Sequence, residues 1–244
     1  MNKTGIIGLG RFGTFWTRVL AHGWEVYGYT RTIPAQPPCE LLSFDELCTL
    51  PVLFLCVPIR TMPEMLDRMA SRLKPGTLVI DTCSVKMEPV RWMKERLPKS
   101  VEIMATHPMF GPESAKEGLS GLPMMMHPVR MADARYQEWL HYFRSLGIMV
   151  VEMTPEEHDR QAAMSQALTH MIGRTLNAMG IDETPIGTLW YRKLLAICRQ
   201  VAKDSPELFF DMQTLNPYAP GMRSDFMDAW NTVCTSLTDL SKDG

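Results

Sequence analysis

The sequence lacks the cysteine spacing of a zinc site or of a redox-active pair. Its six cysteines include no C-x-x-C pair and stand at no zinc-like distance from a histidine. Cys56 lies in an apolar run typical of a buried strand, and Cys198 lies in an apolar helical pattern. Both are therefore expected to be buried, reduced thiols. We expect no metal site.

The sequence also lacks a long apolar run and a strong excess of either charge. No stretch has the roughly 20 apolar residues of a membrane-spanning helix, and the N-terminus has no signal-peptide pattern. With 25 Lys and Arg against 27 Asp and Glu, the formal net charge is −2. This balance gives no electrostatic reason to expect nucleic acid or a membrane as a partner. We expect a cytoplasmic protein in a reducing compartment.

The first part of the chain alternates short apolar runs with helical periodicities. Apolar residues recur at helical spacing between the runs, and Thr61 with Glu64 fits a capping box at one helix start. Repeated strand, helix and strand imply right-handed crossovers and a parallel, doubly wound α/β sheet. The predicted strands are Thr4–Gly8, Glu25–Tyr29, Val52–Val57, Leu78–Ile80, Val101–Ala105 and Ile148–Glu152.

After Glu152 the strand pattern stops. Thr154-Pro155-Glu156-Glu157 is a capping box with proline at the first helical position, so a long helix is predicted from there. Residues 187–202 and 225–240 are predicted helices, with a loop near 216–221. We place the domains at 1–153 and 154–244. About 90 residues is small for a self-sufficient helical domain, so we expect a homodimer formed through it.

A glycine-rich turn joins the first predicted strand to the first helix. Its pattern is G-x-G-x-x-G, in which the first glycine permits a tight turn, the second lets the backbone approach a pyrophosphate and the third allows close packing of helix and strand. The alternative is a glycine turn that binds nothing, but the position between a strand and a helix favours a Rossmann-type dinucleotide site. The residues expected to bind the cofactor here are Gly8, Gly10, Arg11, Phe12 and Gly13.

The second strand is followed by Thr30, Arg31 and Thr32. An NAD-specific enzyme usually has an acid there to hold the ribose 2′-hydroxyl. An arginine between two hydroxyls suits a 2′-phosphate instead, so we expect NADP, with NAD possible. The alternative is that Arg31 is a solvated loop residue and cofactor preference is loose.

Two polar residues follow neighbouring predicted strands, at the edge where an open parallel sheet binds ligands. Ser84 follows residues 78–81 and His107 follows residues 101–105. A histidine suits proton removal from an alcohol, because its unperturbed pKa is near neutrality. The alternatives are a structural loop histidine and a serine that only caps the following helix.

Around these two residues the sequence resembles a known family. Asp81–Lys86 is similar to the D-x-x-S-V-K segment of the prephenate and arogenate dehydrogenases, and Thr106–Ser114 to their H-P-M-F-G-P-E-S segment. Residues 157–159, 165–170, 184–186 and 204–209 also match the short, plant-like arogenate branch. The resemblance spans nearly the whole chain, and the segment around His107 is its most specific part.

The resemblance implies an NAD(P)-dependent oxidative decarboxylation of arogenate or prephenate in tyrosine biosynthesis. Hydride leaves the ring carbon that bears the 4-hydroxyl of the cyclohexadienyl carboxylate substrate, and loss of the ring carboxylate as carbon dioxide makes the ring aromatic. His107 would accept the hydroxyl proton, and Ser84 would bond to the same oxygen or to His107. Positioning of the reactants would supply much of the rate enhancement.

A substrate with carboxylates needs a cationic partner. Arg192 is our candidate, because guanidinium holds a carboxylate with two bonds, although a surface salt bridge is the alternative. Gln166 and His170 are one helical turn apart and both could line the substrate cleft; His170 could equally be a core histidine. His158 and Asp159 are expected to be structural.

Asp204 bears on the choice of substrate. Arogenate has an amino group where prephenate has a keto oxygen, and a carboxylate attracts the ammonium. The alternative is a helix N-cap, since Asp204-x-x-Glu207 fits a capping pattern. We favour arogenate.

Other functions stay open at this point. One is a different reductase with a Rossmann and a helical domain, of the β-hydroxyacid or imine type. Another is a non-catalytic NADP-binding sensor, which would not need Ser84 and His107 at adjacent strand ends. The chain shows no chorismate mutase or regulatory domain, so we expect no feedback by tyrosine through one.

Overall fold

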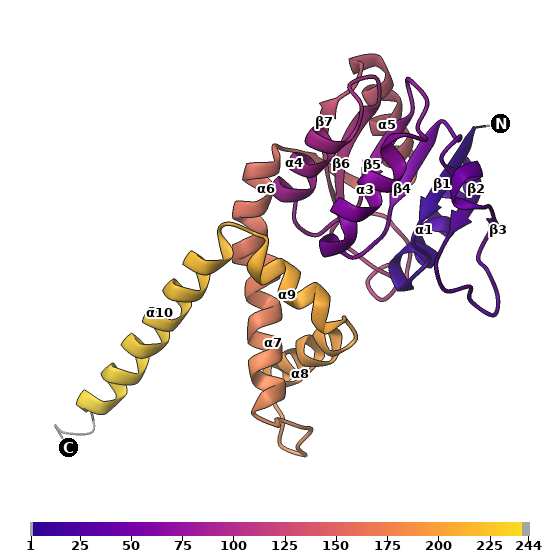
Figure 1. The fold of residues 1–244 in the computed structure, drawn as a ribbon. Helices are drawn as coiled ribbons and strands as arrows, with labels where there is room; N and C mark the ends of the chain where they lie inside the picture. Colours follow the sequence, from indigo (N-terminus) through magenta and orange to yellow (C-terminus); the bar gives the residue numbers. More distant parts are fainter. Residues whose placement is uncertain (1, 241–244) are drawn as a thin grey trace. The chain divides into compact units, whose positions relative to one another are not determined.

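The computed structural model describes residues 2–240 and divides the chain into two compact units. Residues up to His158 form the first unit, and residues from Asp159 onward form the second. The first is an α/β unit and the second is all helical (Figure 1). The predicted fold class, a Rossmann-type sheet followed by a helical part, is confirmed.

The first unit is built on a sheet that has eight strands within the described chain. Their order is β3-β2-β1-β4-β5-β6-β7-β8, so the chain leaves β1 in both directions, as in a doubly wound fold. All neighbours pair in parallel except β6 and β7, which are antiparallel. The strands are β1 Lys3–Ile7, β2 Glu25–Tyr29, β3 Glu40–Leu41, β4 Val52–Leu55, β5 Leu78–Asp81, β6 Glu102–Pro108, β7 Pro123–Arg130 and β8 Met149–Glu152.

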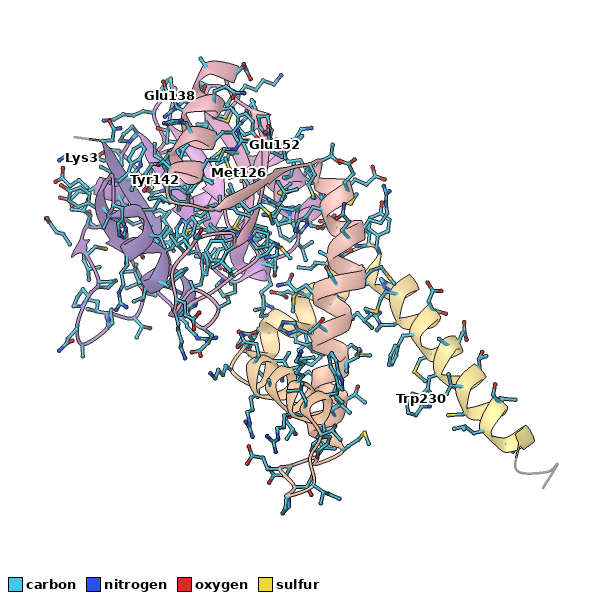
Figure 2. All side chains as sticks on the ribbon, turned by 180° about the vertical axis from the view of Figure 1, so that it is seen from behind. Lys3, Met126, Glu138, Tyr142, Glu152 and Trp230 are labelled. Atoms are coloured by element: carbon cyan, nitrogen blue, oxygen red, sulfur yellow. The ribbon has the colours of Figure 1, made fainter. Side chains whose placement is uncertain are left out.

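Helices cover both faces of this sheet. α1 (Arg11–Leu20) and α5 (Asp133–Ser145) lie on one face, where Trp16 stacks on Phe143 with ring centroids 5.8 Å apart. α3 (Met62–Ala70) and α4 (Met87–Arg96) pack together on the other face. Burial on both faces is why β4 is apolar throughout and β5 is apolar up to Asp81, instead of alternating. Figure 2 labels Met126, a member of this core, and Tyr142, which packs against it.

The antiparallel β7 strand was not expected, and it changes the position of His107. Pairing with β7 extends β6 as far as Pro108, so His107 lies within the strand, opposite Met125, and not after it. Residues 123–130 contain two prolines and a run of three methionines, a pattern with little strand signal. β3, α5 and the short helix α2 (Phe44–Leu47) were also not predicted.

The capping box predicted at Thr61 is wrong. A 3₁₀ turn, η1 (Ile59–Thr61), precedes α3, and the Thr61 hydroxyl donates to the Pro58 carbonyl at 2.7 Å instead of capping the helix. The capping box at Thr154 is confirmed. The Thr154 backbone N–H and hydroxyl donate to the Glu157 carboxylate, and the Glu157 N–H donates to the Thr154 hydroxyl at 3.2 Å.

The helical part follows β8. Its first helix continues through a π-helical segment, and α10 begins at Ala219, so the loop predicted near 216–221 is shorter than expected. A small core of Ala163, Ala167 and Met222 holds η2 against α10. The elements are α6 Pro155–Ala162, η2 Ala163–Ala167, α7 Leu168–Ala178, α8 Leu189–Ala202, α9 Pro206–Thr214 and α10 Ala219–Leu240.

Among the described residues, no helix has both the length and the apolar character needed to cross a bilayer. The same residues contain no group of three or more His, Cys, Asp or Glu side chains arranged to hold a metal ion.

Candidate active site

The turn between β1 and α1 requires glycine at two positions. Gly8 has φ +97°, and a Cβ there would lie 2.4 Å from the carbonyl oxygen of Cys56. A Cβ on Gly13 would lie 1.9 Å from the carbonyl oxygen of Gly8. Both contacts are with backbone, which cannot move aside. The first and third glycines of the pattern therefore have the steric roles that the sequence predicted.

Gly10 differs from the other two, because a Cβ there would meet no atom within 4 Å. Gly10 is the N-cap of α1 without a side-chain cap, and the first turn of α1 contains no acid. An anion at this end would meet backbone N–H groups and the positive end of the helix dipole, without repulsion from that turn. Open space at Gly10 and an uncapped helix start fit a dinucleotide pyrophosphate.

Arg11 and Phe12 are the other two residues of the turn that were predicted to bind the cofactor. Arg11 is exposed and forms a 3.4 Å ion pair with Glu113, which belongs to the segment after β6. Phe12 is half-buried and stacks on Trp16, with ring centroids 5.5 Å apart. Phe12 thus anchors the start of α1 to the core.

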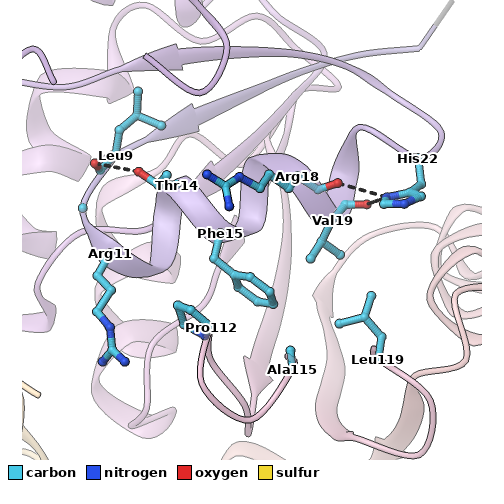
Figure 3. Close-up of a pocket in the computed structure, with 11 residues that line it drawn as sticks. Leu9, Arg11, Thr14, Phe15, Arg18, Val19, His22, Pro112, Ala115 and Leu119 are labelled. Carbon is cyan, nitrogen blue, oxygen red and sulfur yellow. Dashed lines mark hydrogen bonds between the residues drawn. The ribbon is translucent and has the colours of Figure 1, made fainter. Parts of the chain in front are cut away.

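A hollow of about 700 Å³ runs along α1 beside this turn (Figure 3). Gly10 and Arg11 line one end of it, and the Phe15 ring points towards Pro112 and Ala115 of the segment after β6. The segment that follows His107 in the chain thus lies beside the glycine-rich turn.

The end of β2 lies next to the turn, because the Gly8 N–H donates to the Tyr29 carbonyl at 2.8 Å. Thr30 follows directly, and its hydroxyl donates to the Thr32 carbonyl at 3.2 Å. Arg31 stands between them with its side chain exposed. No acidic residue occupies these three positions, so the ribose-binding edge has a cation where an NAD-specific site usually has a carboxylate.

His107 is 4% exposed and is held by a second histidine that the sequence did not single out for the site. His107 Nδ1 lies 2.8 Å from His158 Nε2, and the two rings meet edge to face. His158, from the first turns of α6, is also buried. This contact joins the start of α6 to the sheet, as expected of a structural residue, and it also places His158 against the candidate base. The two histidines are 51 residues apart in the sequence. At that separation the pattern of residues along the chain cannot show that two side chains are in contact.

Ser84 follows β5 by three residues, and β5 pairs with β6 through Asp81 and Ala105. Ser84 thus follows β5, and His107 lies in the part of β6 that continues past its pairing with β5, at the same edge of the sheet. Ser84 is 8% exposed, and its hydroxyl has no hydrogen-bond partner among the described residues. A buried hydroxyl without a partner costs free energy, and such groups are found where a ligand completes the bonding.

A buried ion pair lies beneath these two residues. Lys86 and Asp81, both fully buried, form an ion pair, and Lys86 Nζ also donates to the Thr106 carbonyl at 2.5 Å. The Thr106 hydroxyl in turn donates to the Asp81 carbonyl at 2.6 Å. These bonds fix the residue directly before His107 to the strand that leads to Ser84. Lys86 was part of a matching motif, but its burial was not predicted, because lysine is rarely buried.

The surroundings keep His107 neutral. Burial lowers its pKa well below 6.5, and the nearby charges of His158 and Lys86 lower the pKa further. A neutral imidazole has one nitrogen with a free lone pair, which is the form that accepts a proton.

In the helical part, three of the predicted substrate residues lie near one another. His170 is buried, and its Nε2 is 3.7 Å from an Asp204 carboxylate oxygen. Burial lowers the pKa of His170, and Arg174 adds to this effect while Asp204 opposes it. Gln166 lies in η2, a few residues before His170 in the same run of helix, with its side-chain oxygen buried and unpaired among the described residues.

Asp204 is not the cap of α9. Ser205 is the N-cap, with its hydroxyl accepting from the Leu208 N–H at 3.2 Å, so the Asp204 carboxylate is left to face His170. Arg192 is exposed on α8 and has no contact with the other three in the described chain.

The chain is similar to known proteins over most of its length. Residues 40–146 match the family model for the nucleotide-binding domain of prephenate dehydrogenase, and residues 175–243 match a TYRAAT1-like C-terminal domain. Arogenate dehydrogenase 2, chloroplastic, from Arabidopsis thaliana is 36% identical over 231 residues, which cover 89% of this chain and 64% of that protein. The chain belongs to the prephenate and arogenate dehydrogenase family.

Two further matches show how much of each protein is aligned with this chain. Arogenate dehydrogenase 1, chloroplastic, from the same plant is 34% identical and aligns with 96% of this chain but only 39% of its own length. The chain thus spans less than two thirds of both plant relatives. The crystal structure of A. aeolicus prephenate dehydrogenase with hydroxyphenyl propionate and NAD+ has a TM-score of 0.76 at 19% identity, over 99% of this chain and 92% of that one. At that identity the likeness shows the shared fold.

The buried pair of Lys86 and Asp81 generates a prediction about stability. Lys86→Met leaves a buried carboxylate without its counter-charge and should lower the free energy of unfolding by about 3–5 kcal/mol. Asp81→Asn should have an effect of similar size. The double variant buries no lone charge and should recover most of the loss, as measured by urea unfolding.

Arg91→Met is the matched control, since Arg91 pairs with Glu88 and Glu95 on the exposed side of α4. It should change stability by no more than about 1 kcal/mol. Losses that simply add in the double variant would show that the two buried side chains do not act as a pair.

Proposed function

We propose that this chain catalyses the NAD(P)-dependent oxidative decarboxylation of arogenate, and more weakly of prephenate, in tyrosine biosynthesis. The observation that carries the proposal is the neutral, buried His107, which lies in β6, the strand next to the one that leads to the unpartnered hydroxyl of Ser84. Both belong to the unit that carries the glycine-rich turn. Family membership supports the same reaction class.

The residues of the turn would hold the cofactor. Gly8 and Gly13 form the tight turn, Gly10 would leave room for a pyrophosphate at the start of α1, and Arg31 would meet a 2′-phosphate. When bound, a nicotinamide dinucleotide supplies the ring that accepts hydride from the substrate. We propose NADP as the preferred form, with NAD also accepted.

His107 would act as the general base. Hydride leaves the ring carbon only as the proton of its hydroxyl is removed, and the neutral imidazole takes this proton. We propose that Nδ1–H of His107 donates to His158 Nε2, 2.8 Å away, which would leave Nε2 of His107 with its lone pair for the substrate. His158 is thus a positioning residue that fixes the ring and its tautomer.

Ser84 would bond to the same substrate oxygen. Its hydroxyl can accept the substrate O–H or donate to the oxygen as negative charge develops there. Because the group is buried and has no partner in the described chain, this bond replaces no existing one. The ring carboxylate then leaves as carbon dioxide, and the two electrons of the broken C–C bond complete the aromatic ring.

The helical part would supply the substrate's other contacts. We propose that Gln166 and His170 line its site, that Arg192 binds a carboxylate and that Asp204 binds the ammonium of arogenate. The position of the Asp204 carboxylate, outside the cap of α9 and beside a buried histidine, supports this role.

The first prediction concerns activity. The purified protein, mixed with arogenate and NADP, should form reduced cofactor, which is measured by its absorbance. His107→Asn should lower kcat by about 10²–10⁴-fold, because the general base is lost. In the wild type, kcat/KM should fall only below about pH 6.5, since the low pKa of His107 keeps the base neutral above that value. His141→Asn, an exposed histidine on α5, is the control and should keep full activity. Full activity of the His107 variant would refute the assigned base.

A second prediction concerns the choice between the two cofactors. Arg31→Ala should raise KM for NADP by roughly 10-fold or more, because a hydrogen-bonded charge pair with the 2′-phosphate contributes about 1.5–3 kcal/mol. KM for NAD should stay unchanged, as should both values in the exposed control Lys74→Ala. An equal effect on both cofactors, or a wild type that prefers NAD, would contradict the role of Arg31.

A third prediction concerns the substrate. Asp204→Asn should shift the ratio of kcat/KM for arogenate to that for prephenate by about 10-fold towards prephenate, because the ammonium loses its ionic partner while repulsion of the keto oxygen ends. Asp182→Asn, an exposed acid in the same unit, is the control. An unchanged ratio in the Asp204 variant would remove Asp204 from the substrate site.

A further inference from the structure

Three polar side chains of the helical unit each have a buried atom without a hydrogen-bond partner. The atoms are Gln166 Oε1, His170 Nδ1 and Arg174 Nε, and the described part of this unit contains no other buried side-chain atom of that kind. A buried polar atom without a partner costs free energy. Three of them close together in one helical run indicate a place where a ligand completes the bonding.

The three residues are four positions apart in the sequence. His170 and Arg174 are one turn apart in α7, so they lie on the same side of that helix. Gln166 lies in η2, the π-helical segment that leads into α7. Such segments are rare in helices and are frequently found at functional sites. Gln166, His170 and Arg174 thus form a polar row along the helical run.

Close packing of α8 on α7 brings Asp204 to the polar row (Figure 1). A Cβ on Gly173 would lie 2.6 Å from the Val201 side chain, so the absence of a side chain at Gly173 allows this approach. Asp204 follows three residues after Val201. One of its carboxylate oxygens is 3.7 Å from His170 Nε2, and its backbone carbonyl accepts from Arg174 Nη2 at 2.9 Å.

The Arg174 guanidinium is held in place but keeps donors for a ligand. It lies over the Phe209 ring, 5.3 Å from the ring centroid, and one terminal nitrogen donates to the Asp204 carbonyl. Within the described chain it forms no ion pair and no further hydrogen bond. Stacking on an aromatic ring uses the plane of the guanidinium and not its N–H edge, which is the part that binds a carboxylate.

An acid and a cation that lie side by side suit the amino-acid part of arogenate. This part carries its ammonium and its carboxylate on the same carbon, so the groups that bind them must be neighbours. We propose that Arg174 binds the side-chain carboxylate of the substrate, while Asp204 binds the ammonium beside it. The inference rests on the proposed function and adds a second arginine to it, which leaves Arg192 for the carboxylate on the ring.

Steady-state kinetics tests this contact. Arg174→Gln should raise KM for arogenate and for prephenate alike by about 10-fold or more, because both carry this carboxylate and a bond between charged groups is lost. Asp204→Asn should instead change the ratio between the two substrates. Arg174→Lys keeps the charge without the planar fork and should recover part of the loss. Arg144→Gln, which removes an exposed arginine of α5, is the control and should change neither KM.

Titration calorimetry of the full chain tests the contact without turnover. Tyrosine, the aromatic product of arogenate, carries the same amino-acid part, and tyramine is the same molecule without the carboxylate. The wild type should bind tyrosine about 10-fold or more tightly than tyramine. In Arg174→Gln the affinity for tyrosine should fall to that for tyramine, whose own affinity should not change.

The two ligands separate this contact from a structural role of Arg174 and from the reaction itself. Equal weakening of both ligands in Arg174→Gln, or a wild type without preference for tyrosine, overturns the proposal. Turnover of arogenate by a variant that still prefers tyrosine over tyramine would leave the proposed function standing and refute the contact. A wild type that turns over neither substrate, but whose preference for tyrosine depends on Arg174, would refute the function and support the contact.

Discussion

The candidate active site depends on the buried ion pair of Lys86 and Asp81. Two charges at zero exposure are costly to bury, and they are stable here because each has further hydrogen bonds. Through the Thr106 carbonyl, Lys86 holds the end of β6 beside the end of β5. The same cation also disfavours a proton on His107. One pair of residues thus fixes the place of the candidate base and adds to the effect of burial, which is the main cause of its lowered pKa.

The glycine-rich turn and the catalytic edge belong to one continuous piece of structure. Gly8 and Gly13 bring α1 against the sheet so closely that a methyl group at either position would meet a backbone oxygen. The segment after His107 then packs along α1, where the Phe110 ring contacts Phe15 and Trp16. A cofactor site at the turn and a base on β6 are therefore built on the same rigid core, which suits a reaction that depends on positioning.

The sequence could predict those features that leave a local pattern. The first strands, the glycine-rich turn, the capping box at Thr154 and the position of Ser84 after β5 each follow from spacing within a few residues. β7 could not be predicted in this way, since prolines mask its pattern and its pairing with β6 and β8 makes residues 123–130 a strand. The contact of His107 with His158 and the burial of Lys86 are long-range effects of packing. The capping box predicted at Thr61 is wrong because the chain forms a 3₁₀ turn there, in which the Thr61 hydroxyl donates to the Pro58 carbonyl.

The central claim is that His107 is a neutral base whose tautomer is set by His158. Nitrogen NMR of ¹⁵N-histidine-labelled protein reports this directly, with the signals of His107 identified by their absence in His107→Asn. The account predicts that His107 keeps a protonated Nδ1 and an unprotonated Nε2 as the pH is lowered from 8 through about 6.5. Protonation of both nitrogens at or above pH 6.5, or a proton held on Nε2 in the neutral ring, would contradict it.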